Sequence, residues 1–203
     1  MNKEIIKETI DTIVFVIVAL IIIRFFICEV RWIPSASMKP TLIEGDRVFV
    51  ERFSRFYSKP ERGDIMIFYP PETNLKATPF DVFKRLTGFF CKDTAFIKRV
   101  IALPNEKLEI VHNEDGSTDV LINDKPLEEP YIMDKFEYPI CTPSMTCGPI
   151  TLGEDEYFMM GDNRGHSSDS RYWGVLKENR FIGKAKVLFW PFTRVDYFEK
   201  KQY

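Results

Sequence analysis

The longest apolar stretch of the chain lies close to its N-terminus. Residues 12–23 contain no charged side chain, and after Arg24 the apolar run continues to Cys28. At a rise of 1.5 Å per residue, a helix over 12–28 would be roughly 26 Å long, close to the thickness of a bilayer core. The pattern predicts a retained transmembrane anchor helix over 12–28, preceded by a short tail over 1–11. A buried core helix and a cleavable secretory signal are the alternatives, although the bulky residues after the run are unsuited to cleavage.

After the anchor, apolar positions come in short runs bounded by Pro, Gly, Asn and Asp. Residues 113–116, Asn-Glu-Asp-Gly, separate two of these runs and indicate a hairpin. The runs that predict strands are 47–51, 64–69, 95–102, 107–112, 119–122, 157–160 and 184–190. Because no long helical pattern separates them, the chain is predicted to be mainly β. We expect an antiparallel β-sheet domain over 29–203, with a smaller β insertion, a subdomain of its own, over 106–155.

One segment departs from the strand pattern. Between Thr78 and Cys91, phenylalanine and leucine side chains recur every three or four residues, which is the period of an amphipathic helix. Such a helix could pack on the domain or lie on the membrane surface, and the sequence leaves both interpretations open.

Charge and cysteine content narrow the classes of partner and site. The 28 basic and 30 acidic side chains give a net charge of −2, so nothing in the charge favours nucleic acid as a partner. Cys141 and Cys147 bracket a short loop, where they form a local disulfide or remain two free thiols. His112 and His166 do not stand at spacings that would complete a metal site, so no metal ligand is predicted.

Three short stretches combine side chains that are suited to catalysis. Ser35 and Ser37 lie in a turn before Pro40, a few residues beyond the anchor. Lys98 has apolar neighbours on an alternating strand, where burial would lower its pKa and let the neutral amine act as a base. Residues 161–174 form a loop dense in Asp, Asn, Ser, Arg and Gly, as a hydrogen-bonded scaffold beside a site would be. Taken singly, the three also fit an ordinary turn, a strand-edge lysine and a structured loop.

Together the three stretches resemble the type I signal peptidases, also called leader peptidases. The resemblance rests on SASMKPT around Ser37, FIKRVIALP around Lys98 and GDNRGHSSDSRYWG from Gly161, in that order, with RGDI at 62–65 as a further match. It covers most of residues 31–190. The resemblance implies a membrane-bound serine endopeptidase that cleaves N-terminal signal peptides from secreted preproteins after small residues, at Ala-x-Ala sites, through an acyl-enzyme intermediate.

The resemblance also implies roles for individual residues. Ser37 is expected to be the nucleophile and Lys98 the general base, while the Ser37 backbone N–H and the Ser35 hydroxyl would form the oxyanion hole. Ser167 would orient the lysine. The residues expected to support the site are Asp162, Asn163, Arg164, Asp169 and Arg171. The residues expected to line shallow pockets for small substrate side chains are Ile33, Pro34, Met38, Leu42, Val48, Phe96 and Ile97.

No metal or organic cofactor is implied by the resemblance. The expected partners are the signal peptides of preproteins, the lipid bilayer and the secretion translocon. The implied location is the cell membrane, crossed once, with 1–11 in the cytoplasm and 29–203 as an extracytoplasmic catalytic domain. Three alternatives remain: a hydrolase that uses His112 or His166, a membrane-tethered binding module with an inactive protease fold, and a self-cleaving regulator with a related dyad.

Overall fold

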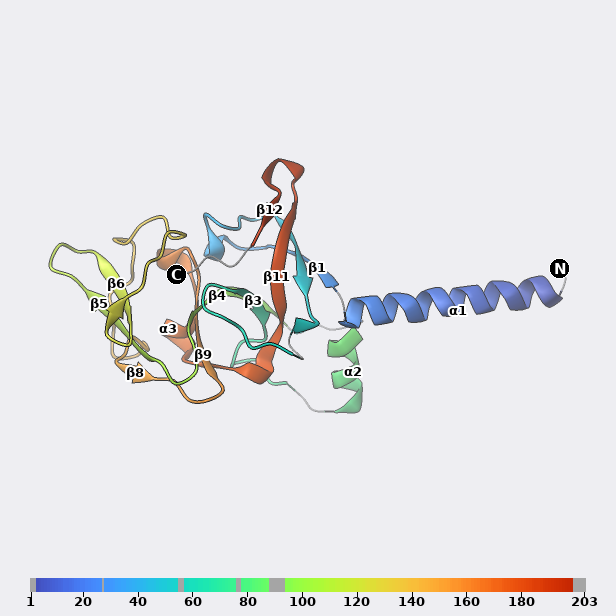
Figure 1. Cartoon of the computed structure of the whole chain (residues 1–203), viewed down its shortest axis with the longest axis horizontal. Coiled ribbons are helices and arrows are strands. Elements are labelled where there is room, and N and C mark those ends of the chain that lie inside the picture. The colour runs from blue at the N-terminus through green and yellow to red at the C-terminus, as the bar shows by residue number, and fades with distance from the viewer. Residues whose placement is uncertain (1–2, 27, 55–56, 76–77, 88–93, 199–203) are drawn as a thin grey trace.

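The structure is a computed structural model that describes residues 3–26, 28–54, 57–75, 78–87 and 94–198. Its first element is helix α1, Lys3–Phe26, which projects from one end of a β-rich body (Figure 1). The other helices are α2 (Pro79–Thr87) and α3 (Ser170–Trp173), and short 3-10 turns occupy Ala36–Met38, Arg164–His166, Glu178–Arg180 and Phe192–Arg194.

Helix α1 differs from the predicted anchor in its bounds. It begins at Lys3, inside the predicted tail, and the strand β1 already begins at Cys28, where the anchor was expected to end. Its apolar side chains are exposed, including Phe15 at 73% and Leu20 at 59%. Within the described part of the chain, no helix combines the length and the hydropathy needed to cross a membrane. Residue 27, and the side chains of several residues before it, lie outside what the structure describes.

A single large antiparallel sheet forms the centre of the body. Its strands follow the order β1-β2-β11-β3-β4-β9-β10, and β12 pairs with β11. The strands are β1 (Cys28–Trp32), β2 (Arg47–Glu51), β3 (Ile65–Phe68), β4 (Phe96–Ala102), β9 (Glu156–Met160), β10 (Leu176–Lys177), β11 (Phe181–Trp190) and β12 (Asp196–Tyr197). All of their pairings are antiparallel, so the prediction of a mainly β, antiparallel fold is confirmed.

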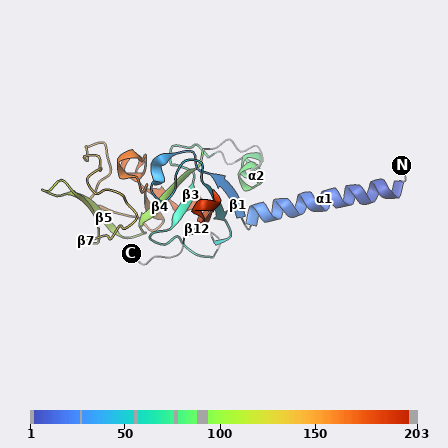
Figure 2. The same ribbon diagram turned by 90° about the horizontal axis from the view of Figure 1, so that it is seen from above.

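A second sheet lies at the end of the body opposite α1 (Figures 1 and 2). Its four strands follow the order β7-β6-β5-β8. They are β5 (Lys107–His112), β6 (Thr118–Ile122), β7 (Lys125–Pro126) and β8 (Ile150–Thr151). The predicted hairpin joins β5 to β6. Asn113 and Gly116 lie in its turn, where Gly116 has a φ of 85°, a conformation that glycine adopts without strain. All four strands fall within the predicted subdomain at 106–155, although the division into domains stays a prediction.

The alternation of β3 side chains explains how the sheet separates two hydrophobic clusters. Ile65 and Ile67 enter the cluster that also contains Met38 and Ile97. Met66 and its neighbour two positions on, Phe68, enter another cluster. Because successive strand residues point to opposite faces, this one short buried strand contributes side chains to both hydrophobic clusters.

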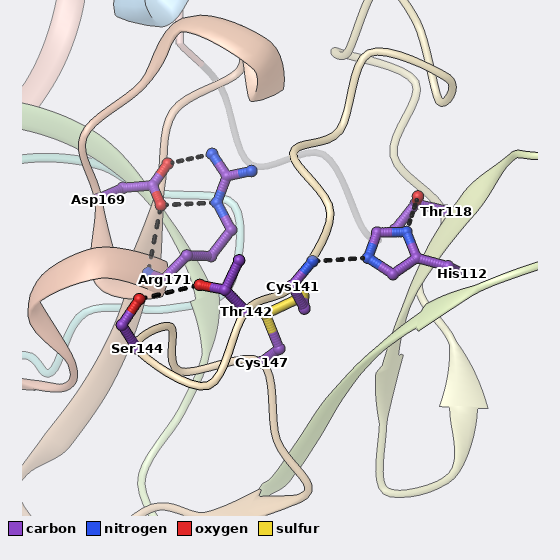
Figure 3. Close-up of a disulfide and its surroundings, with 8 residues drawn as sticks. All are labelled: His112, Thr118, Cys141, Thr142, Ser144, Cys147, Asp169 and Arg171. Atoms are coloured by element: carbon purple, nitrogen blue, oxygen red, sulfur yellow. Dashed lines mark hydrogen bonds and ion pairs between the residues drawn. A yellow bond between two sulfur atoms is a disulfide. The ribbon is translucent and has the colours of Figure 1, made fainter.

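Of the two local questions left open by the sequence, the structure answers the one on the cysteines, while the surface on which the helix lies stays a prediction. The helix expected between Thr78 and Cys91 is present as α2, Pro79–Thr87, and it contacts α1, while 88–93 lie outside the described residues. Phe80 of α2 is 65% exposed. Cys141 and Cys147 form a disulfide, with their Cα atoms 6.2 Å apart (Figure 3).

Candidate active site

Ser37 lies in the 3-10 turn Ala36–Met38, between β1 and β2. The Ile33 N–H donates to the Asp46 carbonyl and the Gly45 N–H donates to the Ile33 carbonyl, so the ends of this connection are tied together. Met38, next to the serine, is completely buried. A hydroxyl that would otherwise sit on a surface turn is therefore held against the sheet.

Lys98 of β4 reaches Ser37 across 61 residues of sequence. Its Nζ lies 2.7 Å from Ser37 Oγ and 2.9 Å from the carbonyl oxygen of Ile97. Lys98 is 4% exposed and Ser37 is 7% exposed, so the contact is shielded from solvent. The distance is within the range required for proton transfer between a nucleophile and its base.

The surroundings of Lys98 favour the neutral amine. Burial is the main cause that lowers the pKa of Lys98 from 10.5 to about 8, and Arg171 lowers it further. Asp169 and Asp162 act in the opposite direction, and they offset the burial only in part. A substantial fraction of the lysine is therefore unprotonated at mildly alkaline pH, as a general base must be.

Ser35 stands beside the pair. Its Oγ is 3.2 Å from Ser37 Oγ, and the residue is exposed, in contrast with buried Ser37. The two hydroxyl groups therefore lie within hydrogen-bond distance of each other.

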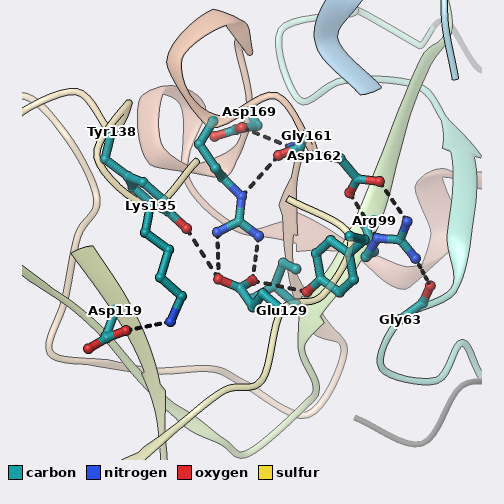
Figure 4. A network of polar contacts seen from close by, with 12 residues as sticks. Gly63, Arg99, Asp119, Glu129, Lys135, Tyr138, Gly161, Asp162 and Asp169 are labelled. Carbon is teal, nitrogen blue, oxygen red and sulfur yellow. Dashed lines mark hydrogen bonds and ion pairs between the residues drawn. The ribbon is translucent and has the colours of Figure 1, made fainter. Parts of the chain in front are cut away.

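The loop after β9 is fixed by ion pairs that are cut off from water. Arg99 donates to the Asp162 carboxylate from Nε at 2.8 Å and from Nη2 at 2.6 Å, and it also donates to the Gly63 carbonyl at 2.8 Å (Figure 4). The Thr41 hydroxyl donates to Asp162 as well. Asp162 is thus held between β4 and the segment that follows Ser37.

Asn163 connects the same loop to the turn that carries Ser37. Its backbone N–H donates to the Ser37 carbonyl at 3.2 Å, and its side-chain amide donates to the Ala36 carbonyl at 3.1 Å. The loop therefore supports the turn at two successive carbonyl groups, and a shift of Asn163 would move Ser37.

A second ion pair closes the far end of the loop. Asp169 accepts from Arg171 Nε and Nη2, both at 2.8 Å, and from the Gly161 N–H at 3.0 Å. Both charged side chains are almost completely buried. These contacts join the start of the loop to α3, whose first turn Asp169 caps.

Ser167 lies at the site without the contact expected of it. Its hydroxyl is buried and has no hydrogen-bond partner among the described atoms. A Cβ built on Gly161 would collide with Ser167 Oγ and with the Ser37 carbonyl oxygen. Gly161 therefore lets the loop, Ser167 and the nucleophile turn approach one another closely.

The residues expected to line the substrate pockets separate into two groups. Ile33, Met38, Leu42, Val48 and Ile97 share one buried hydrophobic cluster. Pro34 is exposed, and Phe96 is half-buried against the cluster on the other face of the sheet.

Phe96 packs against a different hydrophobic cluster from Ile97. Alternation along β4 directs Phe96 to the Lys98 side, where Nζ lies 5.5 Å from the ring centroid, rather than toward Ile97. The assignment of Phe96 to a substrate pocket stays a prediction.

Among the described residues, no hydrogen bond joins either histidine to Ser37 or Lys98. His112 bonds to the Thr118 hydroxyl through Nδ1 at 2.8 Å and accepts from the Cys141 N–H through Nε2 at 3.3 Å (Figure 3). His166 is exposed on the loop. Over the described ranges, no group of three His, Cys, Asp or Glu side chains is placed to hold a metal ion.

Several residues that support the site were not predicted from the sequence. Arg99 and Thr41, which hold Asp162, belong to recognised motifs, but nothing in the alternation pattern pointed to their shared partner. Glu129 lies in a polar segment and is nevertheless only 7% exposed. No periodic signal marks a glutamate that is buried by contacts distant in sequence.

Similarity to known proteins extends over nearly the whole chain. A family described as "Signal peptidase, peptidase S26" matches residues 6–190. Signal peptidase I of Leptolyngbya laminosa is 39% identical over 188 residues, which are 93% of this chain and 81% of that protein. Signal peptidase I of Bacillus licheniformis is 30% identical over 198 residues, covering 96% and 94%. A solved structure of a signal peptidase I from Enterococcus faecalis V583 is 28% identical, with a TM-score of 0.41 and coverage of 63% of this chain and 97% of that chain.

Proposed function

From the premise that the chain belongs to the signal peptidase family, peptidase S26, we propose that it cleaves signal peptides with a Ser37–Lys98 dyad. That it is a hydrolase of the signal peptidase I kind follows from the family. The observation that carries the dyad is the 2.7 Å distance between the buried Lys98 Nζ and Ser37 Oγ.

In the proposed mechanism, neutral Lys98 takes the proton from the Ser37 hydroxyl as Oγ attacks the scissile carbonyl carbon. The protonated lysine then donates its proton to the leaving amine, which leaves an acyl-enzyme on Ser37. Lys98 next removes a proton from a water molecule as the water oxygen attacks the ester carbonyl carbon. When the ester C–O bond breaks, Lys98 returns that proton to Ser37 Oγ, and the acid product leaves. The lowered pKa of Lys98, to about 8, supports this cycle, because the amine must be neutral at its start.

The oxyanion of each tetrahedral intermediate is proposed to lie between the Ser37 backbone N–H and the Ser35 hydroxyl. Two donors aimed at the developing negative charge would stabilise the transition state more than the ground state. The 3.2 Å separation of the two serine Oγ atoms supports this placement of Ser35.

Cleavage after small residues is proposed to follow from the close packing beside the nucleophile. Met38 and Leu42 have no exposed surface, and Ile33 is 2% exposed, so the side chains beside Ser37 are closely packed. An Ala-x-Ala site would fit where Phe would collide, which is selection by exclusion. Equal cleavage rates for Ala and Phe at the residue before the scissile bond would contradict this specificity.

We further propose that α1 attaches the chain to the cell membrane, with residues 29–203 on the extracytoplasmic side, close to the bilayer and the secretion translocon. The exposed apolar side chains along α1, such as Phe15 and Leu20, support attachment, because lipid would remove them from water. The Cys141–Cys147 disulfide is consistent with an oxidising compartment. Recovery of the full chain in the soluble fraction after membrane sedimentation would overturn the attachment.

The decisive experiment is cleavage of a preprotein with an Ala-x-Ala site by the purified full chain in detergent or lipid. Wild type is compared with Ser37→Ala and Lys98→Met, and folding is followed by circular dichroism. Loss of cleavage in both folded variants supports the dyad. Retained cleavage in Lys98→Met would show that another group is the base.

A further inference from the structure

A buried carboxylate connects the segment after β7 to the loop behind the dyad (Figure 4). Glu129 accepts from Arg164 Nη1 at 2.8 Å and also from Arg164 Nη2. The Tyr131 hydroxyl donates to Glu129 at 2.9 Å and the Tyr138 hydroxyl donates at 3.2 Å. Glu129 is 7% exposed and Arg164 is 2% exposed. One carboxylate thus gathers four donors in a site without water access.

Arg164 extends this contact into the loop 161–171. Its Nε donates to the Gly161 carbonyl at 3.0 Å, and its own carbonyl accepts from Arg171 Nη2 at 2.8 Å. Gly161 is the residue that packs directly against the Ser37 carbonyl and Ser167. The path from Glu129 to the nucleophile turn therefore runs through one arginine and one glycine.

Tyr131 brings the second ion pair of the loop into the same cluster. The centroid of its ring lies 4.0 Å from Arg99 Cζ and 6.0 Å from Arg164 Cζ. Arg99 holds Asp162 at the other side of the loop. Attraction between each guanidinium and the ring face ties both arginines to the segment that carries Glu129.

We propose that Glu129 is a positioning residue, which fixes Arg164 and thereby holds the loop 161–171 against Ser37 and Lys98. The inference rests on the proposed dyad, because it concerns how that pair is kept aligned and dry. A buried ion pair is seldom more stabilising than apolar side chains of the same shape, so positioning is a better account of its presence than stability.

The pKa of Lys98 depends on how closely the loop packs against it. Asp162, Asp169 and Arg171 face Lys98 from the loop, and Ser37 faces it from the nucleophile turn. Burial by these packed elements is the main cause of the lowered pKa. If the loop loosens and water enters, the lysine is better hydrated and its pKa rises toward the ordinary value.

The test is Glu129→Gln in the full chain, with cleavage of the Ala-x-Ala preprotein measured across pH. The variant keeps the shape of the side chain but leaves Arg164 without its charge partner. We expect kcat to fall by about 10- to 100-fold, the range typical of residues that orient a metal ligand from behind it. We expect KM to change little and the acidic limb of the kcat/KM profile to move to higher pH.

Two further variants separate positioning from general stability. Lys135→Ala breaks an exposed ion pair with Asp119 in the same region, at 3.0 Å, and should leave kcat and the pH profile unchanged. Tyr131→Phe keeps the Glu129–Arg164 pair but removes one hydrogen-bond donor to Glu129. It should therefore lower kcat and shift the pH profile in the same direction as Glu129→Gln, but to a smaller extent. It remains informative if Glu129→Gln does not fold.

The outcomes distinguish this inference from the dyad itself. An unshifted acidic limb in folded Glu129→Gln, or in Tyr131→Phe if the first variant is unfolded, would overturn the positioning role, even if the yield of active enzyme fell. Persistent cleavage by Lys98→Met would overturn the dyad and the positioning role together. Inactive Lys98→Met with an unaffected Glu129 variant would overturn the positioning role alone.

Discussion

The two faces of β4 place neighbouring cations in contrasting surroundings. Lys98 and Arg99 are 4% and 5% exposed, so both are buried to the same degree. Arg99 holds the Asp162 carboxylate with two nitrogens, whereas Lys98 forms no ion pair with any described residue and contacts the neutral Ser37 hydroxyl. A buried guanidinium stays charged and fixes a carboxylate, whereas burial without an ion pair lowers the pKa of the Lys98 amine.

Replacing the cation on the reactive face should have the largest effect. Lys98→Arg retains the positive charge at the strand position, but a guanidinium does not deprotonate at physiological pH. We expect cleavage to fall by about 10²- to 10⁴-fold, the usual contribution of a general base. The measurement is kcat/KM for the Ala-x-Ala preprotein, with circular dichroism as the folding control. Near-normal activity would mean that charge, and not proton transfer, is what Lys98 supplies.

Breaking the ion pair on the structural face should act mainly on stability. Asp162→Asn leaves Arg99 buried without its carboxylate, which typically costs about 3–5 kcal/mol in the free energy of unfolding. Urea denaturation of the two proteins measures the difference. Asp124→Asn, which breaks the exposed pair with Lys107, is the matched control and should leave the denaturation midpoint unchanged. Similar midpoints for both variants would remove the distinction between the buried pair and the surface pair.

Adding a methyl group at Gly161 should disturb both the loop 161–171 and the turn that carries Ser37. Gly161→Ala would place its Cβ against the Ser37 carbonyl and Ser167, so the loop or the nucleophile turn must move. We expect a loss of about 1–3 kcal/mol of stability, as for other overpacked sites, together with reduced kcat. Gly153→Ala is the control, because its Cβ would meet only the Glu156 side chain, which can move aside. Equal activity of the two variants would argue against a close fit at Gly161.

Changing the pH should titrate Lys98 on the reactive face. The folded pKa of Lys98 is lowered to about 8, so protonation removes the base as pH falls through that value. We expect kcat/KM to fall about tenfold per pH unit well below the midpoint. A profile that stays flat from pH 8 to pH 6 would contradict a titrating lysine base.

Much of the fold could be predicted from alternation alone. The strands at Arg47–Glu51 and Lys107–His112 have the predicted bounds, because each has a clear two-residue period between turn residues. The two-residue strands β7, β8, β10 and β12 were missed, since two residues carry no measurable period. The strand β1 was also missed, because the apolar run of the helix continues up to its first residue.

The candidate site could likewise be predicted only in part. The motifs around Ser37, Lys98 and Gly161 could be recognised because each is a local pattern of residues. Ser167 was expected to orient the lysine, yet its hydroxyl has no hydrogen-bond partner among the described atoms. Glu129 could not be recognised, because only packing between distant segments buries it.

By itself, the sequence determined the mainly β class, the positions of most main strands along the chain and the residue types that chemistry would use. These depend on local steric preference and on the period of apolar side chains, which neighbouring residues set. The tertiary structure alone decided which buried cation is paired, that Lys98 Nζ lies 2.7 Å from Ser37 Oγ, and that a distant glutamate holds the loop behind them. Desolvation and pairing are properties of a packed environment, because they depend on which distant segments exclude water from a side chain.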